Sequence, residues 1–106
     1  IAGMDIGALA PALERRPPGI WFARQQAAVS YPTCGNAACL QVEDGSFWFR
    51  HRNRCIVKVV EQFRPSGPLL DVGGGNGYVA RGLQQAGVDC VLVEPGVEGA
   101  LAAHAR

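Results

Sequence analysis

A run of glycines with carboxylates on both sides is the part of this sequence best suited to chemistry. The run is Gly73–Gly77, which reads Gly-Gly-Gly-Asn-Gly. Glycine permits positive φ and lets the backbone approach a bound molecule with no Cβ in the way. Asp71 precedes the run, and Glu94 follows it at close to the roughly 20-residue spacing of a nucleoside site. Because a carboxylate at a strand end can accept hydrogen bonds from ribose hydroxyls, these residues indicate nucleoside binding.

The charge of Asp71 helps to decide which nucleoside is bound. The dinucleotide fingerprint G-x-G-x-x-G/A formally fits residues 75–80, but this match begins late in the turn and leaves Asp71 unexplained. A carboxylate just before the turn would repel a pyrophosphate. It suits a ligand with a positively charged end, such as the ammonium and sulfonium groups of S-adenosylmethionine. Charge therefore favours the methyl donor over NAD.

The elements around the glycine run must form one βαβ unit. Residues 69–72 predict a short buried strand, residues 78–86 a helix that Gly87 ends, and residues 88–93 a second buried strand. A strand, a glycine turn, a helix and a second strand in this order predict an α/β fold with a parallel sheet. Residues 97–106 begin another helical pattern.

A longer helix is expected before this unit. Ser46 is a good N-cap, and residues 65–68, Pro-Ser-Gly-Pro, stop the helix. Its apolar stripe comprises Phe49, Ile56, Val60 and Phe63. Arg52 and Asn53 fall inside that stripe, whereas a purely structural helix would place them on the opposite face.

The first 45 residues carry weaker patterns and are interpreted as an N-terminal extension that packs on a domain of residues 46–106. Residues 5–16 predict a short helix interrupted by Pro11 and ended by Pro-Pro-Gly. Residues 20–31 are expected to be irregular or hairpin-like, and residues 31–36 form a turn. Residues 39–42 predict a short strand.

Composition limits the class of protein. Apolar residues make up 48% and charged residues 18% of the 106 residues, which predicts a packed core. The net charge of +1 disfavours nucleic acid and anionic membranes as partners. There is no apolar run long enough for a membrane span and no signal-peptide pattern, so we expect a cytoplasmic protein.

The four cysteines are expected to be structural. Cys34 and Cys39 are farther apart than the usual two-residue gap of a zinc pair, although His51 and Cys55 would in principle supply a second pair. We therefore predict no metal, and free thiols in a reducing cytosol with two or more of them buried. Cys90 is assigned to the core.

Three segments together resemble a known family. Residues 70–77, Leu-Asp-Val-Gly-Gly-Gly-Asn-Gly, look like the first motif of class I, Rossmann-like S-adenosylmethionine-dependent methyltransferases, a strand followed by D-x-G-x-G-x-G. Residues 91–96 are similar to the acidic-loop motif of these enzymes. Residues 46–54 resemble the F-W-F-x-x-R-N segment found before the first strand in a bacterial subset. The motifs span residues 46–96 in the order and spacing of the family.

The resemblance implies a role for each matching residue. The loop around the methionine part of the cofactor would comprise Asp71, Gly73, Gly74, Gly75, Asn76 and Gly77. Glu94 would hold the ribose hydroxyls, and Pro95 and Gly96 would shape the edge of the adenosine pocket. The residues that project toward the cofactor carboxylate or the substrate mouth would be Phe49, Arg52 and Asn53. Each has a structural alternative: a tight turn, a solvated or loop-capping carboxylate, or core packing.

The resemblance covers the first half of such a domain. A complete enzyme has a larger sheet, and later motifs supply the adenine contacts and the substrate wall. We therefore expect residues 1–106 to be inactive alone and prone to self-association, with the general base and the acceptor not identifiable. Two rival interpretations stay open: the nucleotide-binding half of an NAD-dependent oxidoreductase, and a non-catalytic Rossmann-like interaction module.

Overall fold

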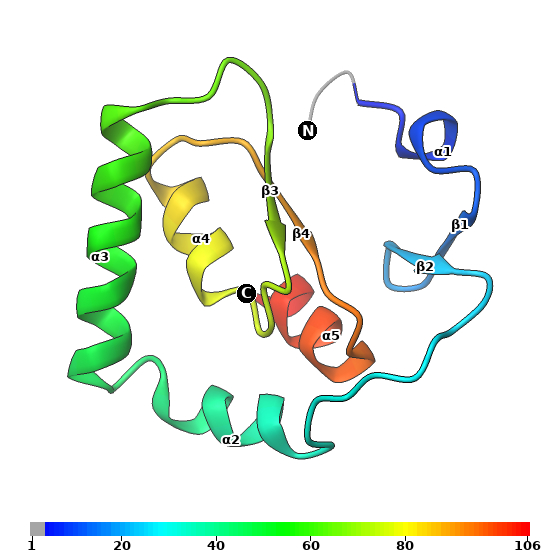
Figure 1. The fold of residues 1–106 in the computed structure, drawn as a ribbon, viewed down its shortest axis with the longest axis horizontal. Coiled ribbons are helices and arrows are strands. Elements are labelled where there is room, and N and C mark those ends of the chain that lie inside the picture. The colour runs from blue at the N-terminus through cyan, green and yellow to red at the C-terminus, as the bar shows by residue number, and fades with distance from the viewer. Residues whose placement is uncertain (1–3) are drawn as a thin grey trace.

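The computed structural model describes residues 4–106 as a mixed α/β arrangement (Figure 1). In chain order the elements are α1 Ile6–Leu9, β1 Leu13–Arg16, β2 Ile20–Ala23, α2 Gly35–Val42, α3 Phe47–Gln62, β3 Leu69–Val72, α4 Tyr78–Gln85, β4 Cys90–Val93 and α5 Val97–Ala105. Among the helices of residues 4–106, none is long and apolar enough to cross a bilayer.

Strands β3 and β4 form the predicted parallel sheet, with α4 as the connection between them. Their register runs from Leu69 opposite Cys90 to Val72 opposite Val93. Strand β4 begins two residues later than predicted: the Val88 N–H still bonds to the Leu83 carbonyl of α4, and only the Asp89 carbonyl contacts β3, through the Leu69 N–H. The carboxyl ends of both strands point to the same edge, at the bottom of Figure 1. Groups that follow β3 and β4 are therefore brought together there.

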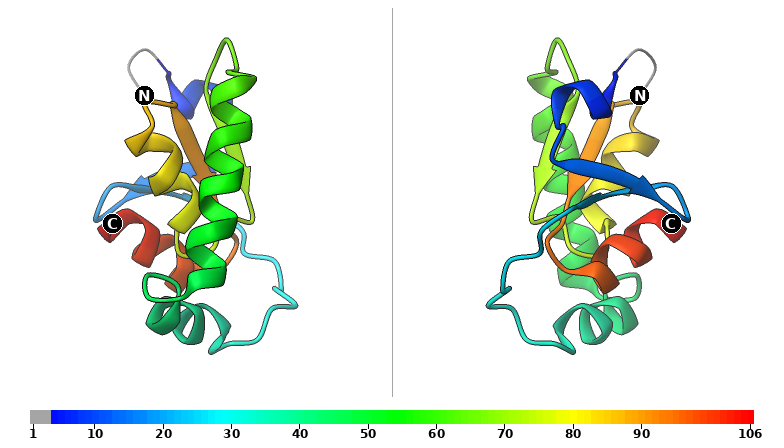
Figure 2. Two further views of the ribbon diagram at one scale, coloured as in Figure 1. Left: turned by 90° about the vertical axis from the view of Figure 1, so that its left-hand side faces the viewer. Right: turned by 90° about the vertical axis from the view of Figure 1, so that its right-hand side faces the viewer.

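The core lies between α4, the sheet and α3. Its buried apolar residues are Ala80, Leu83, Val88 and Cys90. Val57 and Val60 of α3 pack against this cluster, and α3 runs alongside α4 (Figures 1 and 2). The prediction that Cys90 is a core residue is confirmed.

One face of the parallel sheet remains open. Leu70 and Val72 are 58% and 74% exposed, so β3 is a strand as predicted but is not buried on both faces. The described chain exposes 7255 Å², against about 5,700 Å² for a folded monomer of this mass. Apolar surface on this face of the sheet is therefore in contact with solvent.

Helix α3 begins and ends close to the predicted positions. The Ser46 hydroxyl accepts a hydrogen bond from the Phe49 N–H at 3.5 Å, as expected of an N-cap. The apolar stripe, however, ends at Val60. Phe63 is 73% exposed and is the C-cap of α3, where the backbone has left the helical conformation.

The prediction of a helix over residues 5–16 is wrong for most of its length. Helix α1 ends at Leu9, and β1 then pairs antiparallel with β2. Of the residues 20–31 predicted to be irregular or hairpin-like, Ile20–Ala23 belong to this hairpin and residues 24–31 are irregular. Pro11 explains the early end, because its ring and missing N–H oppose continuation of a helix. The Pro-Pro-Gly sequence is therefore the hairpin turn rather than a helix stop.

The strand predicted over residues 39–42 is also wrong. These residues lie in helix α2, where Ala37 and Ala38 favour the helical conformation. The expectation that two or more thiols are buried fails as well. Cys90 is buried, Cys39 is half-buried, and Cys34 and Cys55 are exposed.

Candidate functional site

The glycine run turns the chain from β3 into α4 through positive backbone angles. Gly73, Gly75 and Gly77 have φ values of +76°, +56° and +77°. Side chains rarely adopt this region, which explains glycine at every second position. At Gly77 space is a second reason, since a Cβ there would lie 2.7 Å from the Cβ of Ala103 in α5.

Glu94 ties the glycine run to the loop after β4. One carboxylate oxygen, Oε2, accepts a hydrogen bond from the Gly75 N–H at 2.7 Å, and Oε1 accepts one from the Gly96 N–H at 2.7 Å. Each carboxylate oxygen has a further lone pair, so Glu94 retains the capacity to accept from a ligand. The structure therefore brings Gly75, Glu94 and Gly96 together, with the half-buried carboxylate between the two loops.

Asp71, which precedes the glycine run, has a carboxylate group that lacks a full set of hydrogen-bond partners. Its Oδ2 atom is buried and has no hydrogen-bond partner within residues 4–106. A Cβ on Gly74 would lie 2.6 Å from that atom, so Gly74 leaves room for the carboxylate. Burial raises the pKa of Asp71, and the charge of Glu94 raises it further, while the Arg52 guanidinium opposes both.

A cleft of about 400 Å³ begins at Asp71 and extends between α3, β3 and α4. Its apolar walls include Ile56, Val60, Val79 and Leu83. Arg52 and Asp71 provide its charged groups, of opposite sign. The Arg52 guanidinium lies 4.9 Å and 5.2 Å from the ring centroids of Trp48 and Phe49, and these cation–π contacts steady an otherwise exposed side chain.

Asn53 and Phe49, the other two residues of α3 that were predicted to face the site, connect α3 to α4. Asn53 donates a hydrogen bond to the Tyr78 carbonyl at 3.4 Å, and its amide fills the space above Gly82, where a Cβ would lie 2.5 Å from Nδ2. Phe49 meets the Tyr78 ring edge to face, with centroids 6.4 Å apart. The structure thus places Arg52 at the cleft, and Phe49 and Asn53 against the start of α4.

Asn76 forms a hydrogen bond with a residue that lies outside the predicted motifs. It is buried, and its Nδ2 donates to the main-chain carbonyl of Asn36 in α2 at 2.7 Å. Helix α2 lies beside the carboxyl ends of β3 and β4 (Figures 1 and 2). Pro95 stays exposed beyond Glu94. Residues 1–45 therefore contribute to the site, although they carry no motif that pointed to it.

An ion pair that sequence reasoning missed anchors α2 to α5. Arg106 pairs with Glu43 and also with Asp44, at 3.1 Å. The side chains of Arg106 and Glu43 are 8% and 6% exposed, and the guanidinium lies over the Tyr78 ring at 5.4 Å. Glu43 and Arg106 are far apart in the chain and follow no spacing rule, so no local sequence pattern could predict their pairing.

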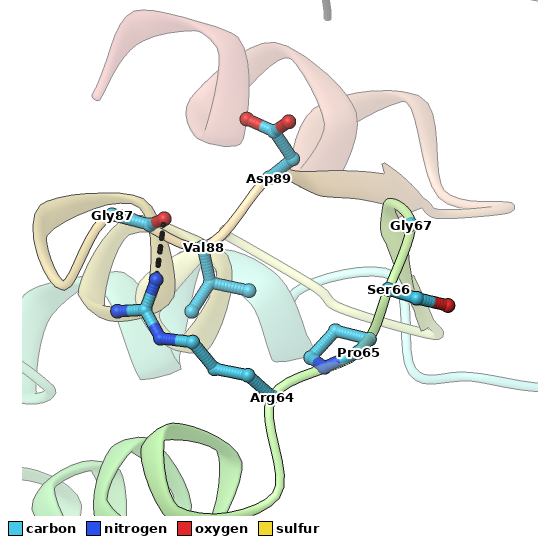
Figure 3. Close-up of a pocket in the computed structure, with 7 residues that line it drawn as sticks. All are labelled: Arg64, Pro65, Ser66, Gly67, Gly87, Val88 and Asp89. Carbon is cyan, nitrogen blue, oxygen red and sulfur yellow. Dashed lines mark hydrogen bonds between the residues drawn. The ribbon is translucent and has the colours of Figure 1, made fainter.

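A smaller hollow of about 150 Å³ lies at the opposite, amino-terminal edge of the strands (Figure 3). Arg64 crosses it and donates to the carbonyls of Ala86 and Gly87, at 2.7 and 3.3 Å. Ala86 is the C-cap of α4 and Gly87 follows it, so the guanidinium caps the carboxyl end of the helix. The charged group in this hollow therefore has a structural role, as a helix cap.

The N–H groups of the glycine run show which ligand it suits. Gly73 donates to the Val93 carbonyl at 2.7 Å, Gly75 to Glu94, and Gly77 to the Gly74 carbonyl at 3.1 Å. A phosphate-binding loop instead presents free N–H groups to the anion. Gly73, Gly75 and Gly77 thus have their N–H groups engaged and two carboxylates lie adjacent, so the run offers an anion fewer donors than a phosphate-binding loop does.

Comparison with protein-family models, with curated proteins and with solved structures finds no match to the chain. Function must therefore be inferred from the geometry of the site.

Proposed function

We propose that this chain carries the S-adenosyl-L-methionine-binding half-site of a Rossmann-like methyltransferase. The observation that carries the proposal is the Glu94 carboxylate, which joins the Gly75 and Gly96 N–H groups at the carboxyl ends of two parallel strands. In open α/β sheets this edge is the usual place for a nucleoside.

The charges in the cleft fit the amino-acid end of that cofactor. The Asp71 carboxylate, with its buried and unpartnered Oδ2, suits the ammonium group, and the Arg52 guanidinium suits the carboxylate. Gly73 leaves open space, since a Cβ there would meet no atom within 4 Å. The volume of about 400 Å³ is in the usual range of roughly 300–1,000 Å³ for small-molecule sites.

The chain's own residues would bind and orient the donor. When bound, S-adenosylmethionine supplies an electrophilic methyl group on a sulfonium sulfur. Asp71 and Arg52 would fix the methionine end, and Glu94 would fix the ribose. The methyl group of the donor would then be held in one orientation toward an acceptor. The negative potential of Asp71 and Glu94 favours the charged donor over a neutral nucleoside.

Calorimetric titration of the protein with S-adenosylmethionine, S-adenosylhomocysteine and NADH tests this proposal. Binding of both methionine nucleosides without binding of NADH is the expected result. NADH binding with no response to either methionine nucleoside would overturn the proposal in favour of an oxidoreductase.

The open sheet face favours a second candidate, a non-catalytic interaction module. Leu70, Val72 and Val93 are all exposed on the two strands, which is unusual for a monomer and suits an assembly surface. This candidate predicts no nucleoside binding and an oligomeric state that Glu94→Ala leaves unaltered. Sedimentation of the unsubstituted and Glu94→Ala chains, with the titration above, separates the two candidates.

A further inference from the structure

The side chain of Asn36 lies among three glycines of the candidate site. A Cβ on Gly96 or Gly99 would lie 3.0 or 2.8 Å from Asn36 Nδ2, and one on Gly75 would lie 3.7 Å from its Oδ1. These glycines belong to three segments: the glycine run, the loop after β4, and α5. One amide from α2 therefore reaches the point where all three meet.

Helix α2 is held in place by groups other than this amide. Its anchors are the main-chain carbonyl of Asn36, which accepts from Asn76, and the Glu43–Arg106 ion pair. In residues 4–106 the side-chain hydrogen bonds at this site are made by Glu94 and Asn76, and none uses the Asn36 amide. The amide thus has a donor and an acceptor to offer a ligand.

Asn36 and Glu94 are chemically complementary neighbours. A Cβ on Gly96 would lie 2.9 Å from Glu94 Oε1 and 3.0 Å from Asn36 Nδ2, so these two atoms are at most 5.9 Å apart and one hydroxyl group can reach both. The carboxylate accepts hydrogen bonds and the amide nitrogen donates them. A hydroxyl between them can donate its proton to Glu94 and accept from Asn36, which is the pattern that a ribose offers.

We propose that Asn36 is a further cofactor-contacting residue, which donates a hydrogen bond to the ribose hydroxyl that Glu94 accepts from. This assignment rests on the proposed function and identifies α2 as a wall of the nucleoside site. It also makes Asn36 a determinant of selectivity for ribose over a sugar without hydroxyls.

A comparison of two ligands tests the assignment. Asn36→Ala removes the amide and keeps the main-chain carbonyl on which Asn76 depends, and Gln41→Ala, at an exposed position of α2, is the matched control. Calorimetry would measure the affinity of each chain for S-adenosylhomocysteine and for its 2′,3′-dideoxy analogue. Asn36→Ala should weaken the first about five- to tenfold, while Gln41→Ala leaves it unchanged. The dideoxy analogue should bind the Asn36→Ala and unsubstituted chains equally.

Other outcomes overturn the assignment. An equal loss of affinity for both ligands would show that Asn36 acts by packing α2, and an unchanged affinity for S-adenosylhomocysteine would show that it makes no contact. Asn36→Asp keeps the shape but replaces the donor by a second carboxylate beside Glu94, so it should weaken binding more than Asn36→Ala. Failure of the unsubstituted chain to bind S-adenosylhomocysteine would overturn the proposed function together with this assignment, and is thereby distinguishable from a failure confined to Asn36.

Discussion

The Glu94 carboxylate accepts a hydrogen bond from the backbone N–H of Gly75, across the βαβ unit, at 2.7 Å. With the equal bond from Gly96, it braces the loops that follow both parallel strands. A site braced in this way is shaped before a ligand arrives, which lowers the ordering cost of binding. Glu94 is therefore a structural brace as well as the proposed ribose acceptor.

Replacement of Glu94 by Gln should reduce both stability and affinity. The amide nitrogen faces an N–H that needs an acceptor, and a buried unpaired group costs about 1–3 kcal/mol. Loss of a charge-assisted bond to the ribose should weaken S-adenosylhomocysteine binding roughly tenfold or more. Urea unfolding and calorimetry measure the two effects, with Glu98→Gln, at an exposed position of α5, as the control. A fall in stability with unchanged affinity would leave Glu94 as a brace alone.

Alanine at Gly73 and at Gly77 should separate conformational strain from steric clash. Both glycines have φ near +76°, where a side chain costs about 1–2 kcal/mol. A Cβ on Gly73 meets no atom within 4 Å, whereas one on Gly77 lies 2.7 Å from Ala103 Cβ and 3.0 Å from its Cα. Gly73→Ala should therefore cost about 1–2 kcal/mol, and Gly77→Ala about 1–3 kcal/mol more. Equal losses in urea unfolding would contradict the predicted contact between the glycine run and α5.

Local rules explain the parts of the structure that the sequence predicted. The N-cap Ser46, the glycines of the loop and the stop at Gly87 each act within a few residues of themselves. The parallel pairing of β3 with β4 followed from their order around a helix. For the same reason, the sequence could place Asp71 and Glu94 at the same edge of the sheet, but it did not indicate the hydrogen bond between Glu94 and Gly75.

The parts that were not predicted depend on contacts between distant residues. Residues 39–42 are compatible with a strand or a helix, and in the structure they continue the helix that begins at Gly35. Asn36 and Glu43 gain their roles from α5 and from the glycine run, which no spacing within residues 1–45 indicates. Asn53 was predicted to face a ligand, yet its side chain contacts Tyr78 and Gly82 of α4, which no pattern within α3 could reveal.

The Glu43–Arg106 pair should contribute far more to stability than its neighbour. Removal of one partner of a buried ion pair costs up to about 3–5 kcal/mol, and after loss of Glu43 the guanidinium keeps only the exposed Asp44 as a partner. Asp44 pairs with the same guanidinium but is 70% exposed, and exposed pairs contribute about 0–1 kcal/mol. Glu43→Gln should thus lower the free energy of unfolding by several times the effect of Asp44→Asn, as measured by urea denaturation. Similar losses for both variants would show that α2 is not anchored through Glu43.

Asp71→Asn should gain stability relative to the unsubstituted chain as pH rises. Burial, and secondarily Glu94, raises the pKa of Asp71 above its ordinary value of 3.8, against the opposing effect of Arg52. A carboxyl group with a raised folded-state pKa contributes stability below its unfolded pKa and loses that contribution as pH rises through the folded value. The asparagine has no such proton, so its advantage in unfolding free energy should grow as the pH rises above 3.8 and level off once the pH exceeds the folded-state pKa of Asp71.

Urea unfolding across this pH range measures the advantage, with Asp89→Asn, at an exposed position, as the matched control. At neutral pH the same Asp71→Asn variant should bind S-adenosylmethionine roughly tenfold or more weakly, because the ammonium group loses its charged partner. A stability that improves while affinity falls is the signature of a carboxylate whose unfavourable burial serves a cationic ligand. A variant that binds the cofactor as tightly as the unsubstituted chain would instead assign Asp71 to the loop alone.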